Sequence, residues 1–566
     1  MQAVREKRPN DVVQTCVKSQ GGYYYMELFY GETIGSMLHR TATLFPERPA
    51  IEYNGRIWTY SELDAISDRV ARGLIAIGIK KGENIGIWAN DRPNTLFCFY
   101  GAVKIGAIPA MLNTSMLPGE IEKLAVDADV RYLFFDEGCR DIDFVGACRD
   151  FKILQLKKGI YIGDVHSEGY MHSISDLQPK GIFSLDDLIE CGDAVEEKDL
   201  HAAKSDVQDT DSDVILFTSG TFGTPKGVVT THFSRVNNSV AQAEAIEAAE
   251  NDKILIATPM FHCFSLSGNI LAAMLVGACV YFPKNRRTRT LLDAIESDRC
   301  TVFSAVPTLY SAIIARKDID RYDLKSLRIG LIGGSMYSPG LFLEIREKLR
   351  FNLLPSLGQT EATAGITAAM THDSEEELSS TVGRFFDHIE AEIRDPITNT
   401  ALPDGSPGEL CIRGYSVMQG YYNRPDLTKT VIDSEGWLHT GDTGYINAAG
   451  NLVLTGRLKE LIIRGGENIA PAEIENVISS DSRVSEVKVI GVPDPHYIEE
   501  ICACVVHNNG QIITDEDIRQ LVRETLAYYK VPRYVLFFDE LPHTPSGKIA
   551  LGILKEAVQG RLGKAR

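Results

Sequence analysis

The chain of 566 residues lacks a Cys-x-x-C pair, and its 11 cysteines are scattered, with Cys502 and Cys504 the closest two. Zinc ribbons and disulfide scaffolds are built on regularly spaced cysteine pairs, so neither class is expected and the thiols should be reduced. The best membrane candidate covers only residues 269–282, short of the roughly 20 residues that cross a bilayer. We therefore expect no integral membrane segment, and we interpret this stretch as a buried helix followed by a strand.

Positive charge is also scarce. Lysine and arginine number 58 against 77 aspartates and glutamates, which gives a net charge of −19. This balance argues against nucleic acid as the main partner and against broad attachment to an anionic membrane. Residues 1–14 hold charges without a following apolar run, so no secretory signal is expected. Hydrophobic residues make up 44% and charged residues 24%, an ordinary globular composition that predicts a cytoplasmic protein.

Helices and strands alternate in the first part of the chain. Amphipathic helices are predicted at residues 62–77 and 96–105, and short apolar strands at residues 83–89 and 107–112. Such alternation is typical of parallel α/β layers. Residues 138–211 are less regular and more charged, and we interpret them as a partly exposed excursion that ends in an acidic linker.

The rest of the chain predicts two further units. Residues 381–456 contain many short strands and turns, which indicate a small β-rich subdomain. The residues after 457 predict a compact α+β unit. The expected fold class is therefore α/β, with an N-terminal extension over residues 1–25, a large layered domain over residues 26–457 and a small C-terminal α+β domain over residues 458–566.

A predicted strand at Val214–Phe217 runs directly into a loop rich in glycine and hydroxyl side chains, Phe217–Val228. Glycines let backbone N–H groups turn toward an anion, hydroxyls add donors, and a lysine adds a compact charge that suits phosphate. The loop is not a Walker A motif, and no Gly-x-Gly fingerprint occurs in the chain. An ordinary surface turn shares part of this composition, but the Pro-Lys-Gly ending favours a polyphosphate loop. Its candidate residues are Thr218, Ser219, Gly220, Thr221, Gly223 and Lys226.

This loop resembles the signature of the adenylate-forming superfamily, which includes acyl-CoA synthetases, aryl-CoA ligases, firefly-type luciferases and the adenylation domains of peptide synthetases. Phe222 stands where the usual pattern has a second threonine. Further motifs follow in the superfamily's order, and the resemblance extends from about Glu32 to Glu556. It implies a nucleotide-binding N-terminal domain and a small C-terminal domain that moves.

The resemblance assigns the nucleotide site to motifs after the loop. In Leu357–Glu361, Thr360 would contact the α-phosphate, and Glu361 would coordinate Mg²⁺ together with Thr221. Mg²⁺ prefers one or two such oxygen ligands plus phosphate oxygens, whereas a lone Thr-Glu pair would more simply begin a helix. Four further positions are implied to bind ATP or AMP, namely Gly334, Ser335, Gly358 and Gln359.

The resemblance also gives roles to residues on both sides of the predicted domain boundary. Asp442 would hold the ribose hydroxyls, because a carboxylate accepts from two adjacent O–H donors. Arg457 would reach the ribose or the phosphates, and Lys459 would be the hinge about which the C-terminal domain rotates. Lys548 would be the catalytic lysine of adenylate formation. A solvated Arg-x-Lys-Glu stretch and a solvated lysine are the alternatives from the residues alone.

Two more motifs border the acyl and thiol side of the implied site. His262 would be the aromatic gate between the carboxylate and the incoming thiol, and a buried, hydrogen-bonded core histidine is the alternative. Gly465 and Gly466 would line the pantetheine tunnel of CoA, since glycines let a thin chain pass close to the backbone. Residues 263–266 carry no acid to pair an amino group, so amino acids are not the expected substrate.

The resemblance therefore implies an AMP-forming acid–thiol ligase that uses ATP, Mg²⁺ and CoA. A carboxylate, expected to be a medium- or long-chain fatty acid, would form an acyl-adenylate and pyrophosphate, and CoA would then displace AMP. Loading of an aryl or fatty acid onto a carrier-protein phosphopantetheine is the nearest alternative. A luciferase-like oxygenase and a catalytically silent binding protein also remain open, and a homodimer is compatible with the sequence.

Overall fold

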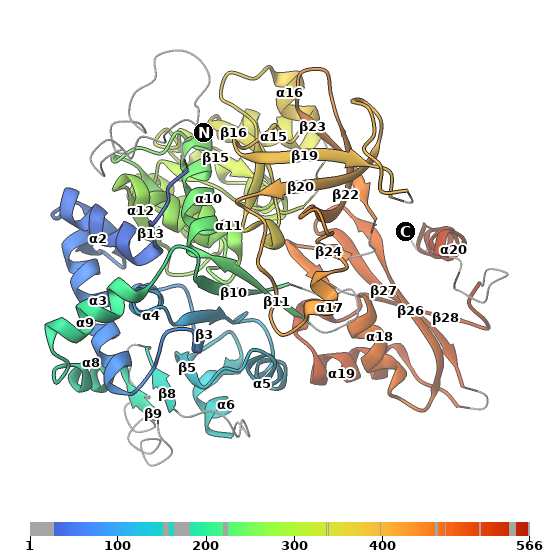
Figure 1. Cartoon of the computed structure of the whole chain (residues 1–566). Helices are drawn as coiled ribbons and strands as arrows, with labels where there is room; N and C mark the ends of the chain where they lie inside the picture. The colour runs from blue at the N-terminus through green and yellow to red at the C-terminus, as the bar shows by residue number, and fades with distance from the viewer. Residues whose placement is uncertain are drawn as a thin grey trace.

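The computed structural model describes the chain over residues 28–150, 158–163, 182–218, 225–335, 337, 339–396, 398–458, 462–469, 471–508, 511–542, 549 and 551–563. Figure 1 shows a large part, coloured from blue through yellow into orange, and a smaller part in deeper orange and red that holds the last strands of the chain. The expected separation into a layered α/β part and a C-terminal α+β part is visible in this view.

The first large sheet is mostly parallel. Its strands β16, β15, β14, β12 and β13 run side by side in parallel, while β17, β18 and β2 are antiparallel additions at the two edges. Within the described residues the nine strands are ordered β18 (Arg384–Phe385), β17 (Gly365–Ala368), β16 (Asn352–Gly358), β15 (Ile329–Ile332), β14 (Val302–Phe303), β12 (Lys253–Leu255), β13 (Cys279–Phe282), β1 (Pro49–Tyr53) and β2 (Arg56–Thr59).

The second large sheet has a parallel centre and an antiparallel edge formed by β11 and β21. Its eight described strands are ordered β21 (Gly420–Tyr421), β11 (Lys226–Thr231), β10 (Ser212–Thr218), β4 (Ile108–Met111), β3 (Asn84–Trp88), β5 (Tyr132–Phe135), β8 (Lys158–Tyr161) and β9 (Ile182–Ser184). The strands predicted at residues 83–89, 107–112 and 214–217 are β3, β4 and β10. In chains of this kind, ligands bind outside the carboxyl ends of parallel strands.

Helices cover and separate the two sheets (Figure 1). The helices before the polyphosphate loop are α2 (Ile34–Leu44), α3 (Tyr60–Ala76), α4 (Pro93–Lys104), α5 (Pro118–Asp127), α6 (Phe144–Asp150), α8 (Leu185–Gly192) and α9 (Glu197–Asp206). Those after it in the large part are α10 (His232–Ala245), α11 (Cys263–Ser265), α12 (Ala272–Val276), α13 (Thr288–Ser297), α14 (Pro307–Ile314), α15 (Pro339–Leu349), α16 (Glu375–Ser380) and α17 (Pro425–Thr428).

Helix α10 joins the two sheets, because it contacts both β10 and β17. Arg235, which is fully buried, forms an ion pair with Asp213 of β10 and donates a hydrogen bond to the Ser267 hydroxyl at 2.7 Å. Ser267 lies in a π-helical stretch, Leu266–Leu271, that precedes α12. The predicted buried helix-to-strand segment is confirmed by α12 and β13, but the π-helical start was not expected.

Two sequence-based boundaries need correction. The helix predicted at residues 62–77 begins earlier, at Tyr60, because Thr59 caps it: the Thr59 hydroxyl accepts from the Glu62 N–H, and the Glu62 carboxylate accepts from the Thr59 N–H at 2.8 Å. The excursion predicted over residues 138–211 is wrong for its described part. There β8 and β9 extend the second sheet, and residues 197–206 of the predicted acidic linker form helix α9.

The predicted β-rich subdomain is a four-stranded antiparallel sheet, ordered β19 (Ile389–Arg394), β20 (Gly408–Gly414), β22 (Leu438–Ile446) and β23 (Leu452–Arg457). The C-terminal sheet is ordered β25 (Glu467–Ile469), β24 (Ile462–Arg464), β27 (Ile498–His507) and β26 (Val484–Asp494), and β28 (Tyr534–Phe538) pairs with β27. The helices around it are α18 (Pro471–Ser479), α19 (Asp515–Thr525) and α20 (Leu551–Gly563).

The C-terminal part has hydrophobic cores of its own. One lies beneath β24, β26 and β27 and runs from Ile462 to Tyr529, and another packs α20 against the opposite face of the same sheet. The last buried residue of the main hydrophobic core is Leu452. Over the part of the chain that the structure describes, no helix combines the length and apolarity needed to cross a bilayer.

Candidate active site

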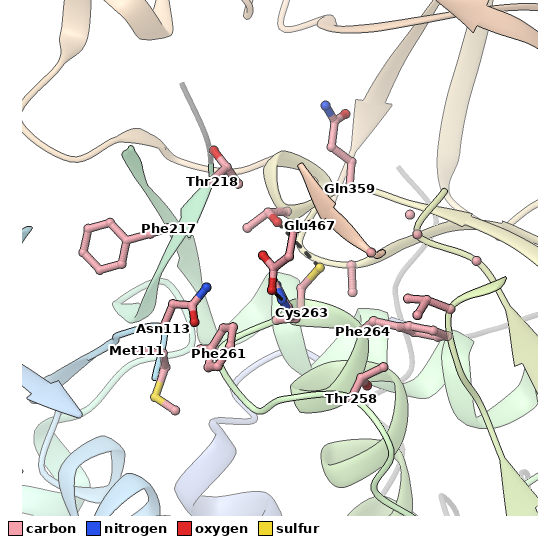
Figure 2. A pocket seen from close by; sticks show the side chains of 18 of the residues that line it. Met111, Asn113, Phe217, Thr218, Thr258, Phe261, Cys263, Phe264, Gln359 and Glu467 are labelled. Carbon is pink, nitrogen blue, oxygen red and sulfur yellow. Dashed lines mark hydrogen bonds and ion pairs between the residues drawn. The ribbon is translucent and has the colours of Figure 1, made fainter. Parts of the chain in front are cut away.

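A cavity of about 210 Å³ lies where the carboxyl ends of strands from both large sheets meet the C-terminal part (Figure 2). Strands β4 and β10 of the second sheet bring Met111, Phe217 and Thr218 to its wall. The first sheet contributes the turns that follow β12, β14, β15 and β16. Of the sequence-predicted residues, the cavity brings together Thr218, His262, Gly334, Gly358, Gln359, Thr360, Glu361 and Gly466.

The segment after β16 forms one wall. Thr360 and Glu361 begin a single 3₁₀ turn, which ends at Thr363 with φ +67°. A β-branched residue rarely adopts this left-handed conformation, and strain of this kind persists only where the surroundings hold it. Here the Thr363 hydroxyl donates to the Ser416 carbonyl at 2.6 Å, and the Met418 N–H donates to the Glu361 carbonyl at 2.9 Å. The turn is therefore fixed against the β-rich subdomain.

Tyr421 connects the Glu361 carboxylate with the predicted phosphate-binding lysine. Its hydroxyl donates to Glu361 Oε1 at 2.9 Å, and the Lys226 ammonium lies 4.5 Å from the centre of its ring. Burial, together with the Glu361 charge, raises the pKa of Tyr421 above its ordinary value, so the phenol remains a donor. One Glu361 oxygen is thus oriented by Tyr421.

The predicted ribose-binding residues lie behind this wall. Gln359 donates from Nε2 to the Thr440 carbonyl at 3.1 Å, which ties the segment after β16 to the strand that carries Asp442. Asp442 is 3% exposed, and its N–H donates to the Thr440 hydroxyl at 3.1 Å. Asp442 is also the cross-strand partner of Arg457 in the β22–β23 pair. The two residues that the resemblance assigns to the ribose are therefore neighbours.

A turn of two glycines at the tip of the C-terminal sheet brings Gly466 to the cavity. Gly465 (φ +62°) and Gly466 (φ +89°) form a two-residue turn between β24 and β25, the kind of hairpin turn that needs left-handed residues. A Cβ on Gly466 would lie 3.3 Å from the Val306 side chain. The next residue, Glu467, points its carboxylate into the cavity (Figure 2) and lies 4.0 Å from His262 Nε2.

A buried ion triad closes the cavity between the two parts of the chain. The Lys530 ammonium lies 2.8 Å from Glu120 of α5 and 2.7 Å from Glu473 of α18. Burial alone would lower the pKa of Lys530, but the two carboxylates outweigh it and hold the pKa above its ordinary value. Burial raises the pKa of Glu473 although Lys530 opposes the shift. Beside the triad, Asn113 Nδ2 lies 3.5 Å from the Tyr529 hydroxyl.

Several predicted residues are not in the cavity. Lys226 lines an adjoining cleft, Gly465 faces Tyr497, and Ser335 is outside the lining although its hydroxyl is buried. Asp442 is not among the residues that line the cavity. The remaining predicted positions lie outside the described residues, namely Ser219, Gly220, Thr221, Phe222, Gly223, Lys459 and Lys548.

Sequence reasoning missed several residues that line the cavity. Lys530 and Tyr529 come from a short 3₁₀ turn after α19, and Gln242 lies on α10 far from any motif. A lysine two residues before a single proline, or a glutamine inside a helix, carries no signal of its own. Asn113 follows the strand β4 and could have been found, because polar residues just after parallel strands face the ligand edge.

The cavity offers polar atoms that suit a nucleotide and a magnesium ion. Among the described residues that line the cavity, Gln359 has a buried Oε1 without a hydrogen-bond partner, which can accept a bond from a base or a sugar. Glu361 supplies a hard carboxylate beside the Thr360 hydroxyl, which is the donor type that Mg²⁺ takes alongside phosphate oxygens.

Comparison with known proteins defines the class. Residues 38–422 match the AMP-binding enzyme family, and residues 473–548 match the AMP-binding enzyme C-terminal domain. The putative acyl-CoA synthetase YngI of Bacillus subtilis is 34% identical over 93% of this chain and 96% of its own length. The mitochondrial medium-chain acyl-CoA ligase ACSF2 of Danio rerio is 32% identical over 94% of this chain and 89% of its own.

A solved structure agrees with these matches. The o-succinylbenzoate CoA synthetase MenE of Bacillus subtilis, a double mutant bound to a product analogue, superposes with a TM-score of 0.76 at 27% identity over 92% of this chain and 98% of its own. The fold and the matches define an adenylate-forming enzyme, which confirms the expected α/β class. The chain belongs to the AMP-binding enzyme family, and within it to the AMP-forming ligases of acyl-CoA synthetase type.

Proposed function

We propose that this protein activates a medium- or long-chain fatty acid with ATP and transfers the acyl group to CoA. The cavity carries the proposal, because the carboxyl ends of both sheets and the Gly465–Gly466 turn converge on it. That arrangement offers a nucleotide side and a thiol side to one reacting carbonyl. ACSF2 of Danio rerio, which bears a medium-chain name, supports the choice of acid.

In the proposed first step, the substrate carboxylate attacks the α-phosphorus of ATP, and pyrophosphate leaves with its bonding electrons. Thr360, Lys226 and the loop over residues 218–226 would bind phosphate oxygens, and Asp442 with Arg457 would hold the ribose. Mg²⁺ on Glu361, with Thr221, supplies charge neutralisation. Lys548 is proposed as the cation that stabilises the transition state, where preorganised charge has its largest effect.

In the proposed second step, the CoA thiolate attacks the acyl carbonyl, and AMP leaves. The described arrangement suits this step, since Gly466 and Glu467 of the C-terminal part face His262 at the cavity. Rotation about Lys459 would exchange this face for the one that carries Lys548, so each half-reaction is closed off from water in turn.

The proposal is tested by ATP-dependent pyrophosphate release with a panel of carboxylic acids of increasing chain length. We expect release with a fatty acid, followed by a thioester when CoA is added. Lys548→Ala should abolish pyrophosphate release while the protein remains folded. Free CoA and a holo-carrier protein, compared as acceptors, separate the proposal from carrier loading. Absence of pyrophosphate release with every acid would reject the proposed function.

A further inference from the structure

The inner wall of the cavity holds an amide without a hydrogen bond. Gln242 lines the cavity and is 2% exposed, and its Oε1 is buried with no partner among the described residues. Thr258 also lines the cavity (Figure 2), is 5% exposed, and has a buried hydroxyl without a partner in the same part of the chain. Buried polar atoms are normally hydrogen-bonded, so two unpartnered groups in the lining of one cavity point to a missing ligand group.

Gln242 is not needed to hold α10 in place. Asn238 lies one turn earlier on the same face of the helix. Its amide is fully used, because Nδ2 donates to the Gly365 carbonyl at 2.8 Å and Oδ1 accepts from the Gly365 N–H at 3.0 Å. These two bonds attach the helix to β17. The amide of Gln242 makes no equivalent bond, although it lies beside the same glycine.

Two glycines from different elements leave room for this amide. A Cβ on Gly365 of β17 would overlap Gln242 Nε2, and a Cβ on Gly268 of the π-helical stretch would lie 3.4 Å from Gln242 Oε1. Phe264 also adjoins Gly268 and lines the cavity. A π-helical insertion is uncommon and frequently marks a functional site. The amide is thus accommodated by a glycine of β17 and a glycine of the π-helical stretch, in the lining of the cavity.

We propose that the preferred acid carries a hydroxyl group on its chain, which hydrogen-bonds with Gln242 and Thr258. This inference rests on the proposed function and narrows its substrate class from plain to hydroxylated aliphatic acids. A hydroxyl both donates and accepts, so it satisfies the amide in either orientation of its oxygen and nitrogen. A plain alkyl chain would cover both groups and leave them without hydrogen bonds. Sites built for a substrate hydroxyl discriminate strongly against an analogue that lacks it.

The test compares octanoate with the hydroxyoctanoates that carry the hydroxyl at each successive chain carbon. Pyrophosphate release gives kcat/KM for each acid with the intact chain. We expect at least one hydroxyoctanoate to exceed octanoate by about tenfold or more. Gln242→Leu, which keeps similar bulk without polar atoms, should bring that ratio close to one. Thr258→Val should lower the ratio in the same direction.

Gln511→Leu is the matched control, because it makes the same chemical change at an exposed position outside the cavity. It should leave the ratio as in the natural chain. The inference is overturned if octanoate matches or exceeds every hydroxyoctanoate in the natural chain, a result that needs no variant to fold. It is also overturned if folded Gln242→Leu keeps the original ratio. Either result with active pyrophosphate release leaves the proposed function intact, whereas no release with any acid rejects both.

Discussion

Lys530→Met should separate the two half-reactions of this enzyme. The Lys530 side chain is 3% exposed, and its ammonium lies within 2.8 Å of carboxylates on both parts of the chain. Methionine keeps the length and removes the charge. Glu120 and Glu473, whose side chains are 11% and 9% exposed, would then face one another across the contact without a cation.

The magnitude follows from the geometry. At 2.8 Å and an effective dielectric constant near 20, each carboxylate attracts the ammonium by about 6 kcal/mol before the cost of burial. Removing one partner of such a buried group costs about 3–5 kcal/mol net. Uptake of a proton by Glu473, whose pKa burial already raises, lessens the loss. We therefore expect the lower end, about 3 kcal/mol, or roughly a hundredfold decrease in the population of this arrangement.

The assay measures each half-reaction alone. Thioester formation from a preformed acyl-adenylate in a single turnover should slow by about a hundredfold, because we propose that this step uses the described arrangement. Pyrophosphate release should change less than about threefold. Lys488→Met is the control, since Lys488 pairs with Glu475 inside the C-terminal part at 3.1 Å. Equal slowing of both half-reactions by Lys530→Met, or thioester formation at the original rate, would refute the reasoning.

Three further predictions concern single groups. Glu361→Gln should lower the rate of pyrophosphate release by about 10²–10³-fold and move the Mg²⁺ dependence to higher concentration. Tyr421→Phe removes only the orienting hydrogen bond at 2.9 Å and should lower the rate by about tenfold or less. The reverse ranking in a magnesium titration would contradict this assignment. Gly466→Ala forces φ +89° on alanine and places its Cβ 3.3 Å from Val306, so thioester formation should slow by about tenfold while Gly450→Ala, equally left-handed but in open space, changes neither half-reaction. Burial, aided by Asp387, raises the pKa of Glu244 to about 7. Between about pH 4.5 and 7 the folded chain therefore holds a proton that the unfolded chain has released. The stability that this group contributes is complete below about pH 4.5 and is lost as the pH rises through 7. Glu244→Gln should therefore raise the unfolding free energy at pH 8 by up to about 3 kcal/mol and leave it nearly unchanged at pH 4, as thermal unfolding at the two pH values would show.

The fold was largely predictable from local patterns. The alternation of apolar strands and amphipathic helices predicted β3, α3, α4, β4 and β10, because each of these segments has a clear apolar pattern in its own residues. The described part of residues 138–211 was mispredicted, since β8 is a strand through its pairing with β5, and β9 through its pairing with β8. A short strand that depends on a neighbour has little signal in its own residues.

The candidate site was predictable only where a motif carries it. Thr360, Glu361 and Gly466 were expected beside a ligand, and the structure brings them to one cavity. Lys530 and Gln242 were not expected, because their roles come from contacts with residues about 410 and 123 positions away in the chain. Such contacts arise from tertiary packing, which periodicity and spacing do not encode.

The separate hydrophobic cores bear on how fast the enzyme can cycle. Separating two apolar surfaces exposes them to water, which costs about 25 cal/mol for each Å² of apolar surface exposed. Separating a hydrogen-bonded polar pair costs little free energy, because both groups then bond to water. The polar contacts between the two parts of the chain include those of Lys530 with Glu120, Asn113 with Tyr529 and His262 with Glu467. Because the C-terminal part has its own hydrophobic cores, it can separate from the rest of the chain and dock again on the millisecond scale without unfolding. Raised ionic strength should favour the separated form.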